Sequence, residues 1–103
     1  MPYNEEPGGQ TRERVRSVSK EPPRYRVLLH NDDYTTMEFV VYVLQSVFRK
    51  SPSEATQIML RVHENGIGVC GVYSFEIAET KVSAVHDLAE QYEFPLKSSM
   101  EEA

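Results

Sequence analysis

A complete helix-start signal at Ser51 constrains this chain more than any other feature. Ser51 can cap a helix, Pro52 suits its first position, and Glu54 completes a capping box. The apolar stripe that follows recurs at helical spacing through Ala55, Ile58, Met59 and Val62. Asn65 and Gly66 then stop the helix.

Two further helices are predicted from the same kind of pattern. Thr35 can cap the first as part of a capping box, and the basic pair Arg49 and Lys50 suits its end. Ser74 can cap the last helix, and Pro95 prevents its continuation. The inner face of this last helix is expected to hold Ile77, Ala78, Val82, Val85, Leu88, Ala89 and Tyr92.

Three short apolar segments have the composition of strands, at residues 25–30, 66–73 and 96–100. The order of elements is therefore β-α-α-β-α-β. One small sheet must be covered by three helices, so the sequence predicts an α+β fold with two layers.

Residues 1–23 differ in composition from the rest of the chain. They hold a glycine pair, four prolines, and four basic against four acidic residues, with little apolar surface to offset the entropy of ordering. We expect a flexible N-terminal extension at residues 1–23 and a core domain at residues 24–103. The whole net charge of −5 then lies on the core domain.

Bulk properties exclude several classes of partner. Lys and Arg are scattered over an acidic chain, which argues against nucleic acid and favours cationic partners, including an amino group. No apolar run approaches the roughly 20 residues needed to cross a bilayer, and no secretion signal is present. We expect a soluble, cytoplasmic, monomeric protein.

The polar cluster Asn31, Asp32 and Asp33 lies between a strand and a helix start. An ordinary solvated turn explains it equally well, and a calcium loop is excluded because Thr36 stands where that loop needs glycine. If the first two helices pack side by side, an apolar face would border Asn31, Asp32, Thr35 and His63; this face consists of Met37, Val40, Met59 and Val62. Such a pocket suits a small ligand, although methionines often only fill a core and a lone histidine is often structural.

Catalysis and metal binding have little support in the sequence. Cys70 lies within an apolar strand segment, where a buried thiol stays protonated. Zinc-ligand spacing, a phosphate loop and a dinucleotide fingerprint are all missing. We expect no enzyme activity, no metal and no cofactor.

Four runs, at residues 31–40, 55–63, 68–73 and 78–82, resemble the signature of the ClpS family, the N-end rule adaptors of the bacterial Clp protease. The resemblance extends over residues 23–101 and is nearly free of gaps. It implies a three-stranded antiparallel sheet with three helices, similar to the C-terminal domain of the ribosomal stalk protein. It also implies binding of proteins that begin with Leu, Phe, Tyr or Trp, and their transfer to the ClpA unfoldase of the ClpAP protease.

The resemblance also implies roles for individual residues. The ligand's α-amino group and first peptide are contacted by Asn31, Asp32 and His63, with Asp33 and Thr35 on the same rim. The pocket for the first side chain is walled by Met37, Val40, Met59, Val62 and Leu96, and Met37 rejects the β-branched Ile and Val. The N-terminal domain of the unfoldase docks on Glu76 and Lys81, and the N-terminal extension serves delivery. Thr36 stands where many members have proline, and we expect no change of function from it.

Two rival interpretations remain at this stage. A scaffold or ribosome-associated domain could share the fold without an amine pocket. A cysteine-dependent enzyme would use Cys70. Neither accounts for all four matched runs.

Overall fold

A computed structural model describes residues 21–103, so the predicted extension at residues 1–23 lies almost wholly outside the described part of the chain. The elements in chain order are β1 (Tyr25–His30), α1 (Met37–Ser46), α2 (Pro52–Asn65), β2 (Ile67–Tyr73), α3 (Phe75–Gln91) and β3 (Lys97–Glu102). This order confirms the predicted α+β class.

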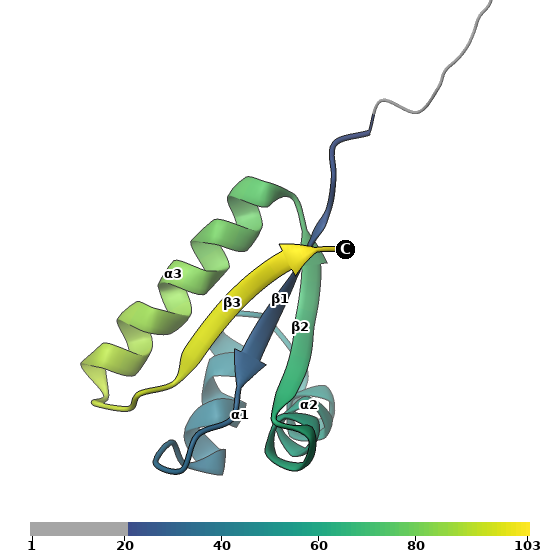
Figure 1. Cartoon of the computed structure of the whole chain (residues 1–103). Helices are drawn as coiled ribbons and strands as arrows, with labels where there is room; N and C mark the ends of the chain where they lie inside the picture. The colour runs from purple at the N-terminus through teal and green to yellow at the C-terminus, as the bar shows by residue number, and fades with distance from the viewer. Residues whose placement is uncertain (1–20) are drawn as a thin grey trace, which may run out of the picture.

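The three strands form one antiparallel sheet in the order β2-β1-β3 (Figure 1). The central strand places Leu29 opposite Gly68 of β2 and Ser98 of β3. A bulge between Val27 and Leu28 shifts the pairing with β2. The predicted three-stranded antiparallel sheet is therefore confirmed.

The helices cover one face of this sheet. Val27 and Leu29 are fully buried and belong to the same hydrophobic cluster as residues of all three helices. α2 packs on β2, α3 packs on β3 and β1, and α1 packs mainly on α2. A Cβ atom at Gly68 would lie 2.7 Å from Val62 Cγ2, so glycine allows α2 to approach β2 closely.

The predicted start and end of α2 are confirmed. The Ser51 hydroxyl accepts a hydrogen bond from the Glu54 N–H (3.2 Å), and the Glu54 carboxylate accepts one from the Ser51 N–H (3.1 Å). Gly66 ends the helix in the left-handed conformation, with φ of 87°, which costs glycine little.

The predicted boundaries of α1 are wrong by a few residues. Its cap is Thr36 and not Thr35: the Thr36 hydroxyl accepts from the Phe39 N–H at 3.1 Å. The helix ends at Ser46, before the predicted basic pair, and Arg49 adopts a left-handed φ of 58°. The chain turns here because it must begin α2 only a few residues later.

The predicted inner face of α3 is correct only in part. Ala78, Val85 and Ala89 are buried, but Ile77 is 50% exposed and Tyr92 47% exposed. Ser74 occupies the cap position without a side-chain hydrogen bond to the helix. The helical repeat of apolar residues does not by itself show which of them are buried, because the sheet covers only part of the helix surface.

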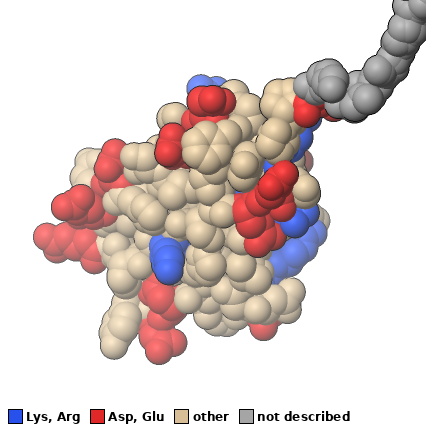
Figure 2. Space-filling model, turned by 45° about the horizontal axis from the view of Figure 1, so that its top comes forward, with Lys and Arg blue, Asp and Glu red and all other residues tan. Residues whose placement is uncertain are grey.

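Acidic side chains gather at the left of Figure 2, on the side where α3 lies in Figure 1.

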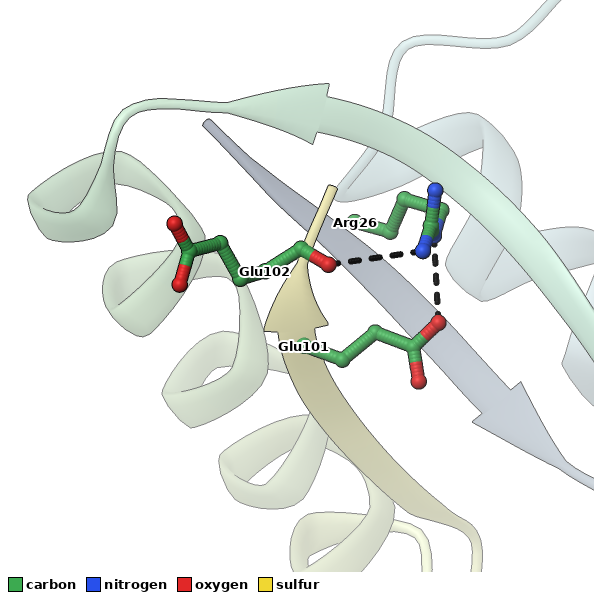
Figure 3. A network of polar contacts seen from close by, with 3 residues as sticks. All are labelled: Arg26, Glu101 and Glu102. Atoms are coloured by element: carbon green, nitrogen blue, oxygen red, sulfur yellow. Dashed lines mark hydrogen bonds and ion pairs between the residues drawn. The ribbon is translucent and has the colours of Figure 1, made fainter. Parts of the chain in front are cut away.

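Arg26 on β1 is the one basic residue of residues 21–103 with an ion pair in the structure, to Glu101 of β3. Its Nε donates to the Glu101 carboxylate at 3.1 Å and its Nη2 to the Glu102 carbonyl at 3.3 Å (Figure 3). The pair is well exposed, so it fixes the strand ends and adds little stability.

Candidate ligand-binding site

A cavity of about 250 Å³ opens between the β1–α1 loop and the helices α1 and α2. Its lining holds nine of the ten residues predicted for the rim and walls: Asn31, Asp32, Asp33, Thr35, Met37, Val40, Met59, Val62 and His63. The structure thus brings together polar side chains from the loop and the last turn of α2 and apolar side chains from the two helices.

The loop is held in shape by Asp32. Its carboxylate accepts hydrogen bonds from the Tyr34 N–H (2.8 Å), the Thr35 N–H (2.7 Å) and the Thr35 hydroxyl (2.7 Å). Partial burial by itself would raise the pKa of the Asp32 carboxyl, but these hydrogen bonds outweigh it and the pKa lies below its ordinary value. The Asp32 carboxylate is therefore ionised, and it accepts hydrogen bonds from the residues of its own loop.

The rim is joined across two distant segments. The Asn31 N–H donates to the Gly66 carbonyl at 2.9 Å, which ties the end of β1 to the end of α2. Because His63 lies in the last turn of α2, this bond brings its exposed ring to the same rim as Asn31. The role of Gly66 was not expected from sequence, although its place after Asn65 marked a helix end.

The apolar wall becomes more buried away from the cavity mouth. Met37 is 43% exposed at the first position of α1, whereas Val40, Met59 and Val62 are 7%, 8% and 2% exposed. A side chain that enters the cavity would pass Met37 first and then meet three buried apolar side chains. Met37 is thus the most exposed of the apolar residues that line the cavity.

Leu96 does not line this cavity, so its predicted place on the wall requires correction. It is 3% exposed and belongs to the same hydrophobic cluster as Val40, Met59 and Val62. It follows Pro95 and directly precedes β3.

The two residues predicted to dock the unfoldase have different surroundings. Glu76 is exposed in the first turn of α3. Lys81 is half-buried, and its Nζ donates to the Val47 carbonyl at 2.7 Å and lies 5.7 Å from the centre of the Tyr73 ring. Lys81 thus satisfies a carbonyl at the end of α1, which no local sequence pattern indicated.

Cys70 is 1% exposed on β2, as predicted for a small apolar strand residue. Burial raises the pKa of its thiol to about 12. Within residues 21–103, no group of three or more His, Cys, Asp and Glu side chains could hold a metal ion. The helices of this same region include none that is long and apolar enough to cross a membrane.

A small α+β domain with an apolar pocket and a carboxylate rim defines a peptide- or ligand-binding module. Its sequence matches a family described as "ATP-dependent Clp protease adaptor protein ClpS" over residues 20–99. The ClpS adaptor of Oleidesulfovibrio alaskensis is 66% identical over 83 residues, which cover 81% of this chain and 80% of that protein. The adaptor of Maricaulis maris is 58% identical over 88 residues, covering 85% and 81%.

A solved structure shows the same fold. Agrobacterium tumefaciens ClpS2, bound to L-phenylalaninamide, has a TM-score of 0.78 and 41% identity, with coverage of 81% of this chain and 100% of that one. The chain belongs to the ClpS family. It is accordingly an adaptor of an ATP-dependent Clp protease and not an enzyme.

Proposed function

We propose that the cavity binds the first residue of proteins that begin with Leu, Phe, Tyr or Trp, and that the adaptor hands them to a ClpA-type unfoldase of the bacterial cytoplasm. The observation that carries this proposal is the shared lining of one cavity by Asp32 and His63 on the polar side and by Met37 and Met59 on the apolar side. One ligand must therefore offer a polar and an apolar end close together, as a chain's first residue does.

An α-amino group is a small cation with three N–H donors. It is best bound by a carboxylate, an amide oxygen and a neutral imidazole nitrogen, and Asp32, Asn31 and His63 supply one of each. A carboxylate has about four acceptor positions, and Asp32 uses three within its loop, so a further donor can still be accommodated. Asp33 and Thr35 complete the rim.

An internal residue would bind poorly for two reasons. It presents an amide where the rim requires a cation, and its chain continues into the wall. Each hydrogen bond to a charged group contributes about 1.5–3 kcal/mol, and full burial of a Leu or Phe side chain about as much. Together these terms are compatible with micromolar affinity, near −8 kcal/mol, after the cost of association.

The size of the cavity supports a single side chain as ligand. At about 250 Å³ it is slightly smaller than the roughly 300–1,000 Å³ of pockets for drug-sized molecules. The ligand of Agrobacterium tumefaciens ClpS2, L-phenylalaninamide, has the chemistry proposed here: a free α-amine, an aromatic side chain and an amide in place of the next peptide bond.

For delivery, we propose that the unfoldase's N-terminal domain docks on the start of α3 around Glu76. This residue is exposed, and Lys81 supports the same surface by its bond to the end of α1. The flexibility of the N-terminal extension and its role in delivery both remain predictions.

The test is a titration of three peptides that differ only in the first residue: Phe, acetylated Phe and Ser. Tight binding of free Phe alone is expected, because only that peptide offers both the amine and the apolar side chain. Equal binding of all three, or none, would leave a domain of this fold without the proposed pocket, and the scaffold interpretation would replace it.

A further inference from the structure

The outer face of α3 is an unpartnered helix face with a charge of one sign. The exposed residues that share it at helical spacing are Glu76, Glu79, Thr80, Ser83, Asp87 and Glu90. The four carboxylates have no ion pair with any residue in the described range 21–103. Lys81, the one lysine of α3, directs its ammonium to the Val47 carbonyl instead.

The N-terminal part of the chain arrives beside this helix. Residues 21–24 line a groove of about 450 Å³ together with residues 72–74 and Ile77. Ser74 caps α3 and Ile77 lies in its first turn, so the chain that precedes Glu21 leaves the domain at the N-terminal end of α3. Figure 1 shows this exit near the upper end of α3.

The ten residues just before this exit are basic. Residues 11–20 contain Arg12, Arg14, Arg16 and Lys20 against the single acid Glu13, a net charge of +3. Residues 1–10 contain only Glu5 and Glu6 as charged side chains, a net −2. The basic half of the extension is therefore the half attached next to the acidic face.

The lengths also agree. Ten extended residues span about 33 Å, whereas the 17 residues of α3 span about 26 Å. Arginines two residues apart on an extended chain lie about 6.6 Å apart on one side. The acids form two pairs, Glu76 with Glu79 and Asp87 with Glu90, and within each pair the carboxylates lie about 4.5–6 Å apart. The two pairs are separated by eight residues, about 12 Å, so basic side chains along an extended segment can meet an acid near each end of the face.

We propose that residues 11–20 dock along the outer face of α3, with Lys20 near Glu76 and the three arginines opposite the acids toward its C-terminal end. The contact is electrostatic and lies at the surface, so it is weak and sensitive to salt. It holds the extension along the domain until a stronger partner takes the same helix face.

One consequence rests on the proposed function. Glu76 belongs both to this face and to the surface proposed for the unfoldase, so the unfoldase and the extension compete for it. Docking of the unfoldase would then release the extension at the moment of delivery.

The docking is tested on the full chain, without cargo or unfoldase, so its failure leaves the proposed function standing. A nitroxide is attached to Ser17→Cys, and mass spectrometry verifies that Cys70, 1% exposed, stays unlabelled. At about 0.02 M NaCl, where the Debye length is about 20 Å, amide signals of Glu79, Ser83 and Asp87 should lose intensity. At about 0.5 M NaCl, with a Debye length of about 4 Å, that loss should disappear.

Two variants of equal charge change separate docking from general attraction. Asp87→Asn with Glu90→Gln should abolish the loss on α3, whereas Glu38→Gln with Glu64→Gln, on α1 and α2, should preserve it. The proposal is overturned if the loss is spread evenly over the domain, survives high salt, or responds alike to the two double variants.

Discussion

At the scale of single residues, Asp32 has two tasks. Three hydrogen bonds from Tyr34 and Thr35 make it the centre of the β1–α1 loop, and the same residue lines the cavity. The pattern Asn31-Asp32-Asp33 was compatible with an ordinary turn, and the structure shows that turn and rim are the same feature.

Replacement of Asp32 should therefore reduce ligand affinity strongly. Asp32→Ala removes a charged acceptor and loosens the loop, so a peptide with N-terminal Phe should bind about 10–100-fold more weakly. Glu90→Ala, an exposed carboxylate on α3, is the control and should leave affinity unchanged. Equal losses in a calorimetric titration would show that the rim assignment is wrong.

Met37 should control which first residues are accepted. Met37→Ala leaves room beside the branched carbon of Ile or Val, so peptides that begin with these residues should bind where the original protein rejects them. Leu60→Ala is a matched control, because Leu60 is 40% exposed on α2 and does not line the cavity. If both variants reject Ile and Val as the original does, Met37 is not the selecting residue.

At the scale of elements, the end of α1 depends on a side chain from α3. Lys81 Nζ donates to the Val47 carbonyl, so a residue predicted for docking also joins two helices. Loss of docking in a Lys81 variant would therefore not by itself identify a contact with the unfoldase.

Melting curves separate these two roles. Lys81→Met should lower stability by about 1 kcal/mol, or about 4–8 °C in Tm for a domain of this size. Glu76→Gln should leave Tm unchanged and weaken binding of the unfoldase's N-terminal domain. An unchanged Tm for Lys81→Met would mean that its bond to Val47 contributes nothing.

The approach of α2 to β2 depends on Gly68. In Gly68→Ala the new Cβ meets Val62 Cγ2, and because Val62 is a cavity wall, both stability and peptide affinity should fall, stability by about 1–3 kcal/mol. Gly71→Ala is the control for affinity, since its Cβ meets the Tyr73 ring, which does not line the cavity. Similar peptide affinities in the two variants would show that the wall adapts without cost.

At the scale of the whole molecule, we expect the buried thiol of Cys70 to lower stability in alkali. Burial raises the pKa of Cys70 from an ordinary value near 9 to about 12, and burial also raises the pKa of the neighbouring Tyr73. A raised folded-state pKa means that the protonated form is favoured on folding. The stabilising contribution is present below pH 9 and is lost as the pH rises toward about 12.

The free energy of unfolding should thus fall between about pH 9 and 12, with Cys70 contributing up to about 4 kcal/mol of that fall. Cys70→Ala should show a shallower alkaline decline in denaturant titrations, even if it is less stable at neutral pH. Parallel declines for the two proteins would contradict the assignment to Cys70.

The sequence by itself determined the order of elements, the start and end of α2, and all nine residues that line the cavity. Capping boxes, helix-ending glycine and hydrophobic period depend on residues close in the chain, so a local pattern is enough to find them. Helical spacing and the polar turn already suggested eight of these residues, and the resemblance of four runs to the ClpS family added Asp33. That resemblance is confirmed by the family match over residues 20–99.

Tertiary structure decided what depends on contacts between distant segments. Only packing shows that Asn31 bonds Gly66, that Lys81 reaches the end of α1, and that Leu96 is buried in the core outside the lining of the cavity. The cap of α1 moved from Thr35 to Thr36 because Asp32 engages the Thr35 hydroxyl. The bonds of Asn31 and Lys81 join segments more than 30 residues apart, so no window of neighbouring residues contains that information.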